Sequence, residues 1–179
     1  MRLLKQKTNE HPIQMKATWI LSNDPEIIPP LVDHLKKATE LLRVCDESIW
    51  QQVALAIHEA LQNAIMHGNL EISSAQRTSD LESYKKLVTE RRQTPPYSNR
   101  CVYMNMFISQ QSIIFIVRDE GPGFDVSQLP DPTSPSNLGK LSGRGVFLIR
   151  ALMDEVNFNK IGNQITMVKK WELADEEAA

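Results

Sequence analysis

Hydrophobic and polar residues follow two different spacings in the first part of the chain. Apolar residues alternate with polar ones over residues 15–21, which predicts a strand. Apolar residues at helical spacing then predict helices over residues 25–42 and 47–66. A later start of the first helix, at Pro29-Pro30, is the alternative. Asp46 stands immediately before the second helix, where an aspartate can accept the free backbone N–H groups of the first turn. The chain is therefore expected to begin as strand, helix, helix.

The second part of the chain favours strands arranged as hairpins. Residues 100–108 and 112–118 are rich in β-branched, aromatic and Met residues, and a short polar link joins them. This pattern predicts an antiparallel pair. Beyond it the sequence predicts a helix over residues 146–153 and two more strands, which a two-residue Gly162-Asn163 turn joins.

Two leading helices followed by hairpins indicate an α+β fold. We expect a two-layer sandwich, with a mostly antiparallel mixed sheet and helices on one face. Residues 15–173 should form a single domain behind a loose segment, residues 1–14. Residues 72–97 are polar and charged, and we interpret them as an insertion. Within it, an amphipathic helix over residues 80–92 is predicted to make contact through Leu81, Tyr84, Leu87 and Val88.

Composition excludes several classes of function. The 179 residues carry a net charge of −2 and no broad basic block, so direct nucleic-acid binding is not expected. No apolar run approaches the length that spans a membrane. Cys45 and Cys101 lack metal-ligand spacing, and we expect free thiols in a reducing, cytoplasmic environment.

The stretch DEGPGF at residues 119–124 follows the strand that ends at Arg118 and carries the first candidate chemistry. Asp119 could accept a hydrogen bond from an amine or a ribose hydroxyl. Gly121 and Gly123 would allow a backbone to approach a ligand closely. An ordinary loop is the alternative, since Asp-x-Gly-x-Gly also makes one.

A second pair of glycines, Gly143 and Gly145, opens the helix predicted over residues 146–153. Backbone N–H groups at a helix N-terminus bind phosphate, so this position suits a nucleotide. The preceding residues 129–142 include Gly139 and three prolines. They could form a lid that closes over a ligand, or a simple long connection.

The helix over residues 47–66 has a polar face that could complete the site. Glu59 and Asn63 lie one turn apart, and His67 follows after another turn. An Asn can ligate Mg²⁺ and a Glu can take a proton, although a solvated face is the alternative. His67 is expected to act as a cap or hydrogen-bonding residue. Gly68 is the expected left-handed cap at the helix end.

Together these three segments resemble a known superfamily. The stretch EALQNAIMHG at residues 59–68 resembles the N-box of the Bergerat-fold ATP-binding (GHKL) superfamily, which includes histidine kinases, gyrase, Hsp90 and MutL. Asp119-x-Gly121-x-Gly123 resembles its first glycine box, and residues 142–145 its second. The boxes stand in the family's order, and within the superfamily the anti-sigma-factor serine/threonine kinases are the most similar subgroup.

The resemblance implies an ATP- and Mg²⁺-dependent protein kinase. Glu59 would be the general base and Asn63 the Mg²⁺ ligand, while Asp119 would accept from the adenine amine. The partner would be an anti-sigma-factor antagonist, a sigma factor or both, and a homodimer is possible. The implied cofactor-binding residues are Asn63, His67, Asp119, Gly121, Gly123, Gly139, Gly143, Arg144, Gly145 and Val146.

Two features depart from the compact anti-sigma kinases. The insertion at residues 72–97 has no counterpart there, and Arg144 inside the second glycine box could reach phosphate or face solvent. A nucleotide-gated binding module without phosphotransfer is the alternative function. The catalytic part of a histidine kinase is disfavoured, because a dimerising helix hairpin has no room ahead of Met15.

Overall fold

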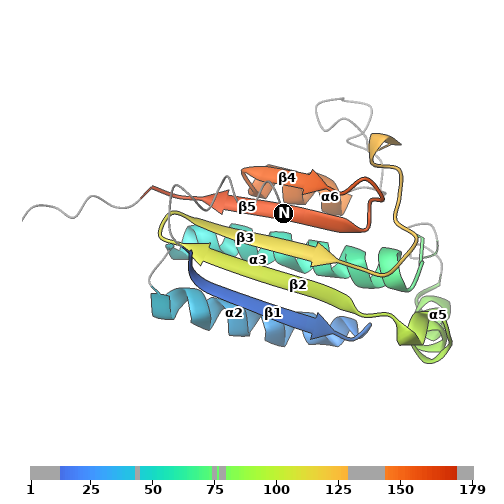
Figure 1. The fold of residues 1–179 in the computed structure, drawn as a ribbon. Coiled ribbons are helices and arrows are strands. Elements are labelled where there is room, and N and C mark those ends of the chain that lie inside the picture. Colours follow the sequence, from blue (N-terminus) through green and yellow to red (C-terminus); the bar gives the residue numbers. More distant parts are fainter. Residues whose placement is uncertain (1–12, 43–44, 74–75, 77–79, 129–143, 173–179) are drawn as a thin grey trace, which may run out of the picture.

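The computed structural model describes residues 13–42, 45–73, 76, 80–128 and 144–172. Within these ranges, five strands form one sheet in the order β1-β2-β3-β5-β4 (Figure 1), and every pairing is antiparallel. The predicted α+β class is therefore confirmed. The strands are β1 (Ile13–Leu21), β2 (Val102–Ser109), β3 (Ser112–Arg118), β4 (Glu155–Phe158) and β5 (Gln164–Lys170).

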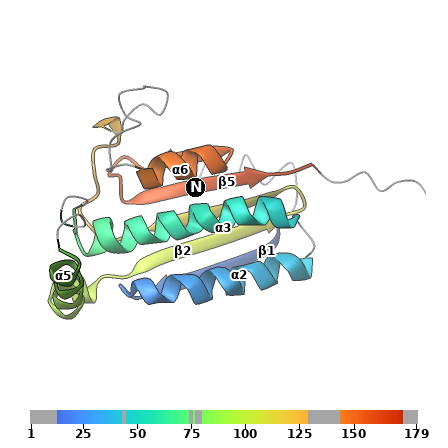
Figure 2. The same ribbon diagram turned by 180° about the vertical axis from the view of Figure 1, so that it is seen from behind.

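Three helices cover one face of this sheet, as predicted. α2 (Ile28–Leu42), α3 (Glu47–Gln62) and α6 (Arg144–Leu152) lie side by side on that face (Figure 2). The side chain of Asp46 accepts the backbone N–H of Ile49 and caps α3, also as predicted. Short 3₁₀ turns are η1 (Pro25–Ile27), η3 (Tyr97–Asn99) and η4 (Val126–Gln128).

The core lies between the sheet and the three helices. Val102, Met104 and Met106 alternate along β2, and all three are fully buried. Ile57 and Leu61 of α3 are fully buried in the same cluster. The alternation and the helical spacing thus identify the buried faces correctly, because each element has a single face against the core.

The opposite face of the sheet carries polar and aromatic side chains together with isoleucines such as Ile114 and Ile116. Thr18 donates to Asn105 across β1 and β2 at 2.8 Å. The guanidinium of Arg118 lies 4.5 Å from the ring centroid of Tyr103. This face is therefore chemically distinct from the one that the helices cover.

The insertion contributes α5 (Leu81–Gln93), which lies beyond the end of the sheet, close to the C-terminal end of α3 (Figure 1). Tyr84, Leu87 and Val88 pack against the core, as predicted. Leu81 was expected on the same side, and this is wrong: the side chain is 63% exposed. It is the first residue of α5, one turn ahead of the packed side chains.

The end of α3 differs from the prediction at Gly68. The helix continues as a π-helix, η2 (Asn63–Asn69), in which the N–H of Leu70 donates to the carbonyl of Ile65 at 2.9 Å. Gly68 is therefore inside the helix and is not a left-handed cap. The residue with left-handed backbone is Glu71, at φ 51°.

The connection between β4 and β5 is a five-residue loop, residues 159–163, and the predicted two-residue turn is wrong. Such a turn of type I′ needs positive φ at both central residues, whereas here only Gly162 has it, at 83°. The side-chain oxygen of Asn159 organises the loop by accepting the N–H groups of Gly162 (2.8 Å) and Asn163 (3.1 Å).

Truncating the core face of α3 tests this packing. Ile57→Ala should reduce the free energy of unfolding by about 2–5 kcal/mol, because it leaves a cavity in a fully buried site. Leu55 lies on the same helix and is 43% exposed, so Leu55→Ala serves as the control and should change it by about 0.5 kcal/mol or less. Urea titration of both variants measures the difference, and equal losses would contradict the assigned core.

Candidate functional site

Asp119 leaves the end of β3 and packs directly on the helix that carries Gly68. The aspartate is 8% exposed. A Cβ placed on Gly68 would lie 2.4 Å from Asp119 Cγ, and one on Gly121 would lie 2.2 Å from the Gly68 carbonyl oxygen. Since real Cβ contacts are longer, only glycine at positions 68 and 121 lets the strand end and the helix approach this closely.

The two oxygens of the Asp119 carboxyl group have different surroundings. One accepts the backbone N–H of Gly121 at 2.9 Å. The second accepts no hydrogen bond from another described residue, yet it is not fully buried. Burial raises the pKa of Asp119 to about 6, although the Gly121 N–H and the charges of Arg100 and Arg118 oppose the increase. The accessible oxygen is therefore a preformed acceptor for a donor from outside the chain.

The loop between β4 and β5 holds this segment from the other side. The N–H of Asp119 donates to the Asn163 carbonyl at 3.0 Å, and the Asn163 side chain donates to the Asp119 carbonyl at 3.2 Å. Further along, the N–H of Phe124 donates to the Ile161 carbonyl at 3.0 Å. Gly123 makes this approach possible, because its φ is 76° and a Cβ there would lie 2.1 Å from the Ile161 oxygen.

Glu59 near the end of α3 and Asn63 at the start of η2 are both half-buried and face the first turn of α6. A Cβ on Gly145 would be 2.8 Å from Glu59 Oε2, 3.2 Å from Asn63 Nδ2 and 3.4 Å from Asn63 Oδ1. The two side chains are thus in contact with the N-terminus of α6, rather than fully solvated. Backbone N–H groups at such a terminus attract anions.

One helix therefore links the two ends of the candidate site. Asn63 faces α6, and five residues further on Gly68 faces Asp119. The two contacts are therefore separated by little more than one turn of the π-helix. A carboxylate acceptor at one end and a helix N-terminus at the other could bind an elongated ligand with a donor group and an anionic group.

The other predicted site residues are less central or lie outside the described residues. Arg144 is exposed at the start of α6, and Val146 is half-buried. His67 is exposed, and its Nδ1 donates to the Ile72 carbonyl at 2.5 Å, which agrees with a hydrogen-bonding role. Gly139, Gly143 and the proposed lid over residues 129–142 lie outside the described residues.

Sequence reasoning missed two asparagines that support Asp119. Asn163 bonds the Asp119 backbone, and Asn69 accepts the N–H of Glu120 at 2.7 Å. The available signal was weak. Asn69 follows the presumed helix end and Asn163 stands in a presumed turn, where asparagine is common for local reasons.

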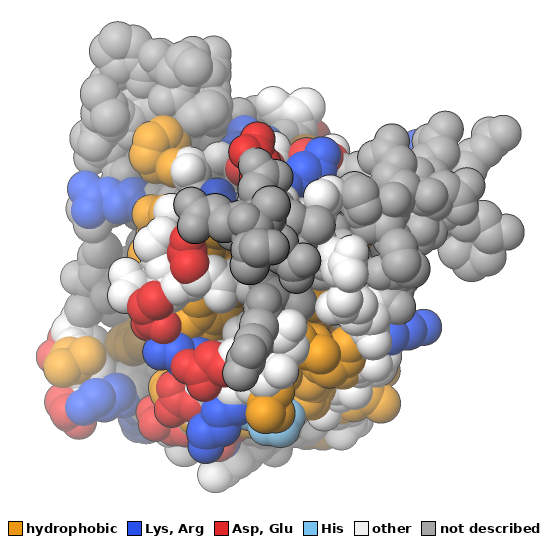
Figure 3. Space-filling view, turned by 90° about the vertical axis from the view of Figure 1, so that its left-hand side faces the viewer, with side chains coloured by type: hydrophobic (Ala, Val, Ile, Leu, Met, Phe, Trp, Pro, Cys, Tyr) orange, Lys and Arg blue, Asp and Glu red, His pale blue; other side chains and the backbone are white. Residues whose placement is uncertain are grey.

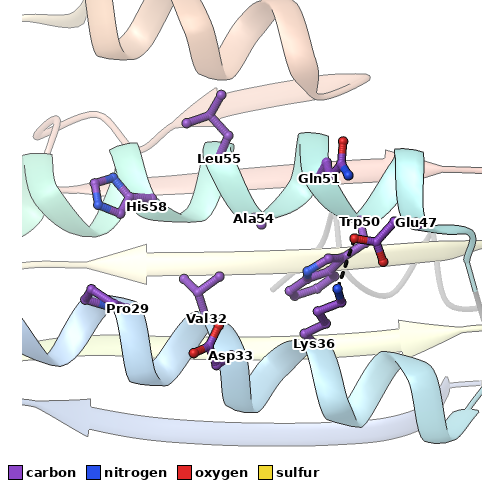
Figure 4. Close-up of a pocket in the computed structure, with 10 residues that line it drawn as sticks. All are labelled: Pro29, Val32, Asp33, Lys36, Glu47, Trp50, Gln51, Ala54, Leu55 and His58. Carbon is purple, nitrogen blue, oxygen red and sulfur yellow. Dashed lines mark hydrogen bonds and ion pairs between the residues drawn. The ribbon is translucent and has the colours of Figure 1, made fainter.

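A separate groove of about 460 Å³ lies between α2 and α3 (Figure 4). Trp50, Val32 and Leu55 contribute apolar surface, and Lys36 is hydrogen-bonded to Glu47 at one end. None of the predicted site residues lines this groove. We therefore place the candidate site at Asp119 and α6, where glycines and acceptors converge.

Charged side chains of both signs lie on the described surface. On the face drawn in Figure 3, acidic and basic side chains are interspersed over the described surface. Among the described residues, no group of three or more His, Cys, Asp or Glu could hold a metal ion. In the same residues, no helix combines the length and the apolar character needed to cross a membrane.

Comparison with known proteins agrees with the geometry. The profile of the histidine kinase-like ATPase domain family matches residues 21–169, which include all three candidate segments. No individual curated protein matches the chain. The family accounts for the sheet, the helices on one face and an ATP-binding function. The chain belongs to the histidine kinase-like ATPase domain family, within the Bergerat (GHKL) superfamily.

Proposed function

We propose that this protein is an ATP-dependent serine/threonine protein kinase of the anti-sigma-factor type. Family membership supports ATP binding, and such domains are typically ATP-using kinases. The observation that carries the proposal is the arrangement along one helix: Gly68 contacts the acceptor Asp119, while Glu59 and Asn63 contact the start of α6.

At one end of the site, Asp119 would recognise adenine. Its accessible carboxyl oxygen would accept the exocyclic amine, while its other oxygen keeps the hydrogen bond from Gly121. Guanine has a keto oxygen at the same position, which cannot donate a hydrogen bond to the Asp119 carboxylate. The site should therefore select ATP over GTP.

At the other end, the phosphates would lie against the N-terminus of α6. In nucleotide sites, phosphate oxygens and waters supply most of the Mg²⁺ ligands, and the protein supplies only one or two. The amide oxygen of Asn63 could therefore be the protein's ligand. Arg144, exposed at the same terminus, could contact the phosphates.

Glu59 would act as the general base. It would take the proton of the partner's serine or threonine hydroxyl as that oxygen forms a bond to the γ-phosphorus. The bond from the γ-phosphorus to the bridging oxygen breaks in the same step, and ADP leaves. The partner would be an anti-sigma-factor antagonist, which the resemblance of residues 59–68 to the N-box of that subgroup supports.

The first prediction concerns base selectivity. Wild-type protein should bind Mg-ATP and Mg-ADP clearly more tightly than Mg-GTP. Asp119→Asn should lose most of this selectivity, because the amide both donates and accepts. Calorimetric titration measures the affinities, with Asp125→Asn, an exposed aspartate in the same loop, as the control. Equal affinities for ATP and GTP in the wild type would remove the assignment.

The second prediction is a pH dependence. The adenine amine favours the ionised carboxylate, so ATP affinity should fall as the pH decreases through about 6, the pKa of Asp119. The phosphates of ATP also titrate, but equally for wild type and Asp119→Asn. Affinities measured from pH 5 to pH 8 should therefore diverge above pH 6 and converge below it.

Burial of Asp119 has the opposite effect on stability without ligand. The folded pKa is about 6 and the ordinary value is 3.8, so the folded state holds the proton more tightly between them. The contribution of Asp119 to the free energy of unfolding should decrease as the pH rises from 3.8 to 6. Asp119→Asn should lack this dependence in urea titrations, and an identical pH profile would contradict the burial effect.

A fourth prediction separates phosphotransfer from binding. Glu59→Gln should reduce labelling of the partner by about 10²–10⁴-fold while ATP affinity stays near the wild-type value. Asn63→Ala should weaken Mg-ATP binding and labelling together. Glu47→Gln, at the exposed start of α3, is the matched control.

The partner is obtained by pull-down from the native extract and incubated with [γ-³²P]ATP. Parental labelling by Glu59→Gln would exclude Glu59 as the base. A wild-type protein that binds ATP and its partner without ever labelling it would favour the nucleotide-gated binding module instead.

A further inference from the structure

The insertion and the residues that follow it contact the chain at the end of η2, the helix that continues from α3. Arg91 of α5 donates to the carbonyl of Leu70. Arg100, just after η3, donates to the Asn69 carbonyl at 2.8 Å and pairs with Glu71 at the same distance. Both guanidinium groups lie over one ring, that of Tyr97, at 4.9 and 5.3 Å from its centroid.

These contacts supply what the end of a helix needs. The last carbonyls of a helix have no partner within it, and positive side chains there are stabilising. The chain then turns at Glu71, whose φ of 51° is unfavourable for a residue with a Cβ. At this turn, the Glu71 side chain forms the ion pair with Arg100. Arg91 of the insertion and Arg100, three residues beyond it, thus replace the glycine cap expected from the sequence.

Asn69 connects these contacts to the loop that holds Asp119, through hydrogen bonds of its side chain. Its side chain is fully buried, donates to Asn23 Oδ1 at 2.7 Å and accepts the N–H of Glu120 at 2.7 Å. Asn23 in turn donates to the carbonyls of Tyr97 (2.7 Å) and Arg100 (2.9 Å). The N–H of Glu120 belongs to the same planar peptide group as the Asp119 carbonyl. Displacing it therefore rotates the residue that carries the carboxylate.

We infer that Asn69 is a positioning residue for the nucleotide site, and that the insertion sets the geometry of Asp119 through Arg91, Arg100 and Asn23. The inference rests on the proposed function, in which Asp119 accepts the adenine amine. The insertion would then affect how selectively the site binds adenine.

Selectivity for the base is the decisive readout, because a general loss of stability lowers ATP and GTP affinity alike. Asn69→Ala should reduce the GTP-to-ATP ratio of dissociation constants by about tenfold, the value of one well-placed hydrogen bond. Arg91→Gln should change the ratio in the same direction, and by less, since Arg100 remains. Lys86→Gln removes an exposed positive charge from the same helix, and the wild-type ratio is expected.

A double-mutant cycle tests whether Asn69 acts through Asp119. In the Asp119→Asn background, Asn69→Ala should leave the ratio unchanged, because the acceptor it positions is already lost. Amide hydrogen exchange at Glu120 should speed up in Asn69→Ala and in Arg91→Gln, but not in Lys86→Gln.

Three outcomes would overturn the inference. A folded Asn69→Ala protein with the wild-type ratio would make Asn69 a purely structural residue. If Asn69→Ala does not fold, the test rests on Arg91→Gln. An unchanged ratio of dissociation constants and unchanged amide exchange at Glu120 would show that the insertion does not influence Asp119. Equal ATP and GTP affinity in the wild type would instead fail the proposed function itself, and the inference with it.

Discussion

The contact between Gly68 and Asp119 is the constraint on which the site depends. It brings the end of β3 against the helix that carries Glu59 and Asn63, so Asp119 packs on the same helix from which these two side chains project. An alanine at position 68 would place a Cβ 2.4 Å from the carboxyl carbon. Strand and helix would then have to separate, and the distance between the two ends of the site would change.

This contact also buries a carboxylate, which is unfavourable unless the group is hydrogen-bonded. The structure satisfies one oxygen with the Gly121 N–H and fixes the Asp119 backbone through Asn163. The second oxygen accepts no hydrogen bond from another described residue, and burial raises the pKa of Asp119 to about 6. A ligand that donates a hydrogen bond to this oxygen would offset part of the free energy that burial of the charged form costs.

Local patterns were sufficient to predict the elements and their buried faces. The alternation in β2, the spacing of Ile57 and Leu61 in α3, and Asp46 as its cap are all determined by neighbours in sequence. The errors arise where distant segments decide. Gly68 was interpreted as a helix cap because glycine often ends helices. Its actual reason is Asp119, 51 positions later in the sequence.

The same limit applies to the loop at residues 159–163 and to Asn69. A Gly-Asn pair between two strands favours a tight turn, but Asn163 is drawn away by its bonds to Asp119. Asn69 has no pattern of its own, since its partners Asn23 and Glu120 are 46 and 51 residues distant. The stretch at residues 59–68 and the two glycine boxes indicated the site from sequence, through resemblance to a family. The supporting residues Asn69 and Asn163 could be identified only from the three-dimensional structure.

A consequence follows for the insertion. Coupling between two sites is reciprocal, so a nucleotide that fixes Asp119 must stabilise the Asn69 contacts as much as those contacts favour the nucleotide. The affinity of any ligand that engages α5 or η3 would then depend on the bound nucleotide, provided that it alters Arg91 or Arg100. Both guanidinium groups lie over the ring of Tyr97, so a ligand that displaces this ring would alter both contacts. Binding of a ligand to the insertion would thereby change the affinity of the site for nucleotide.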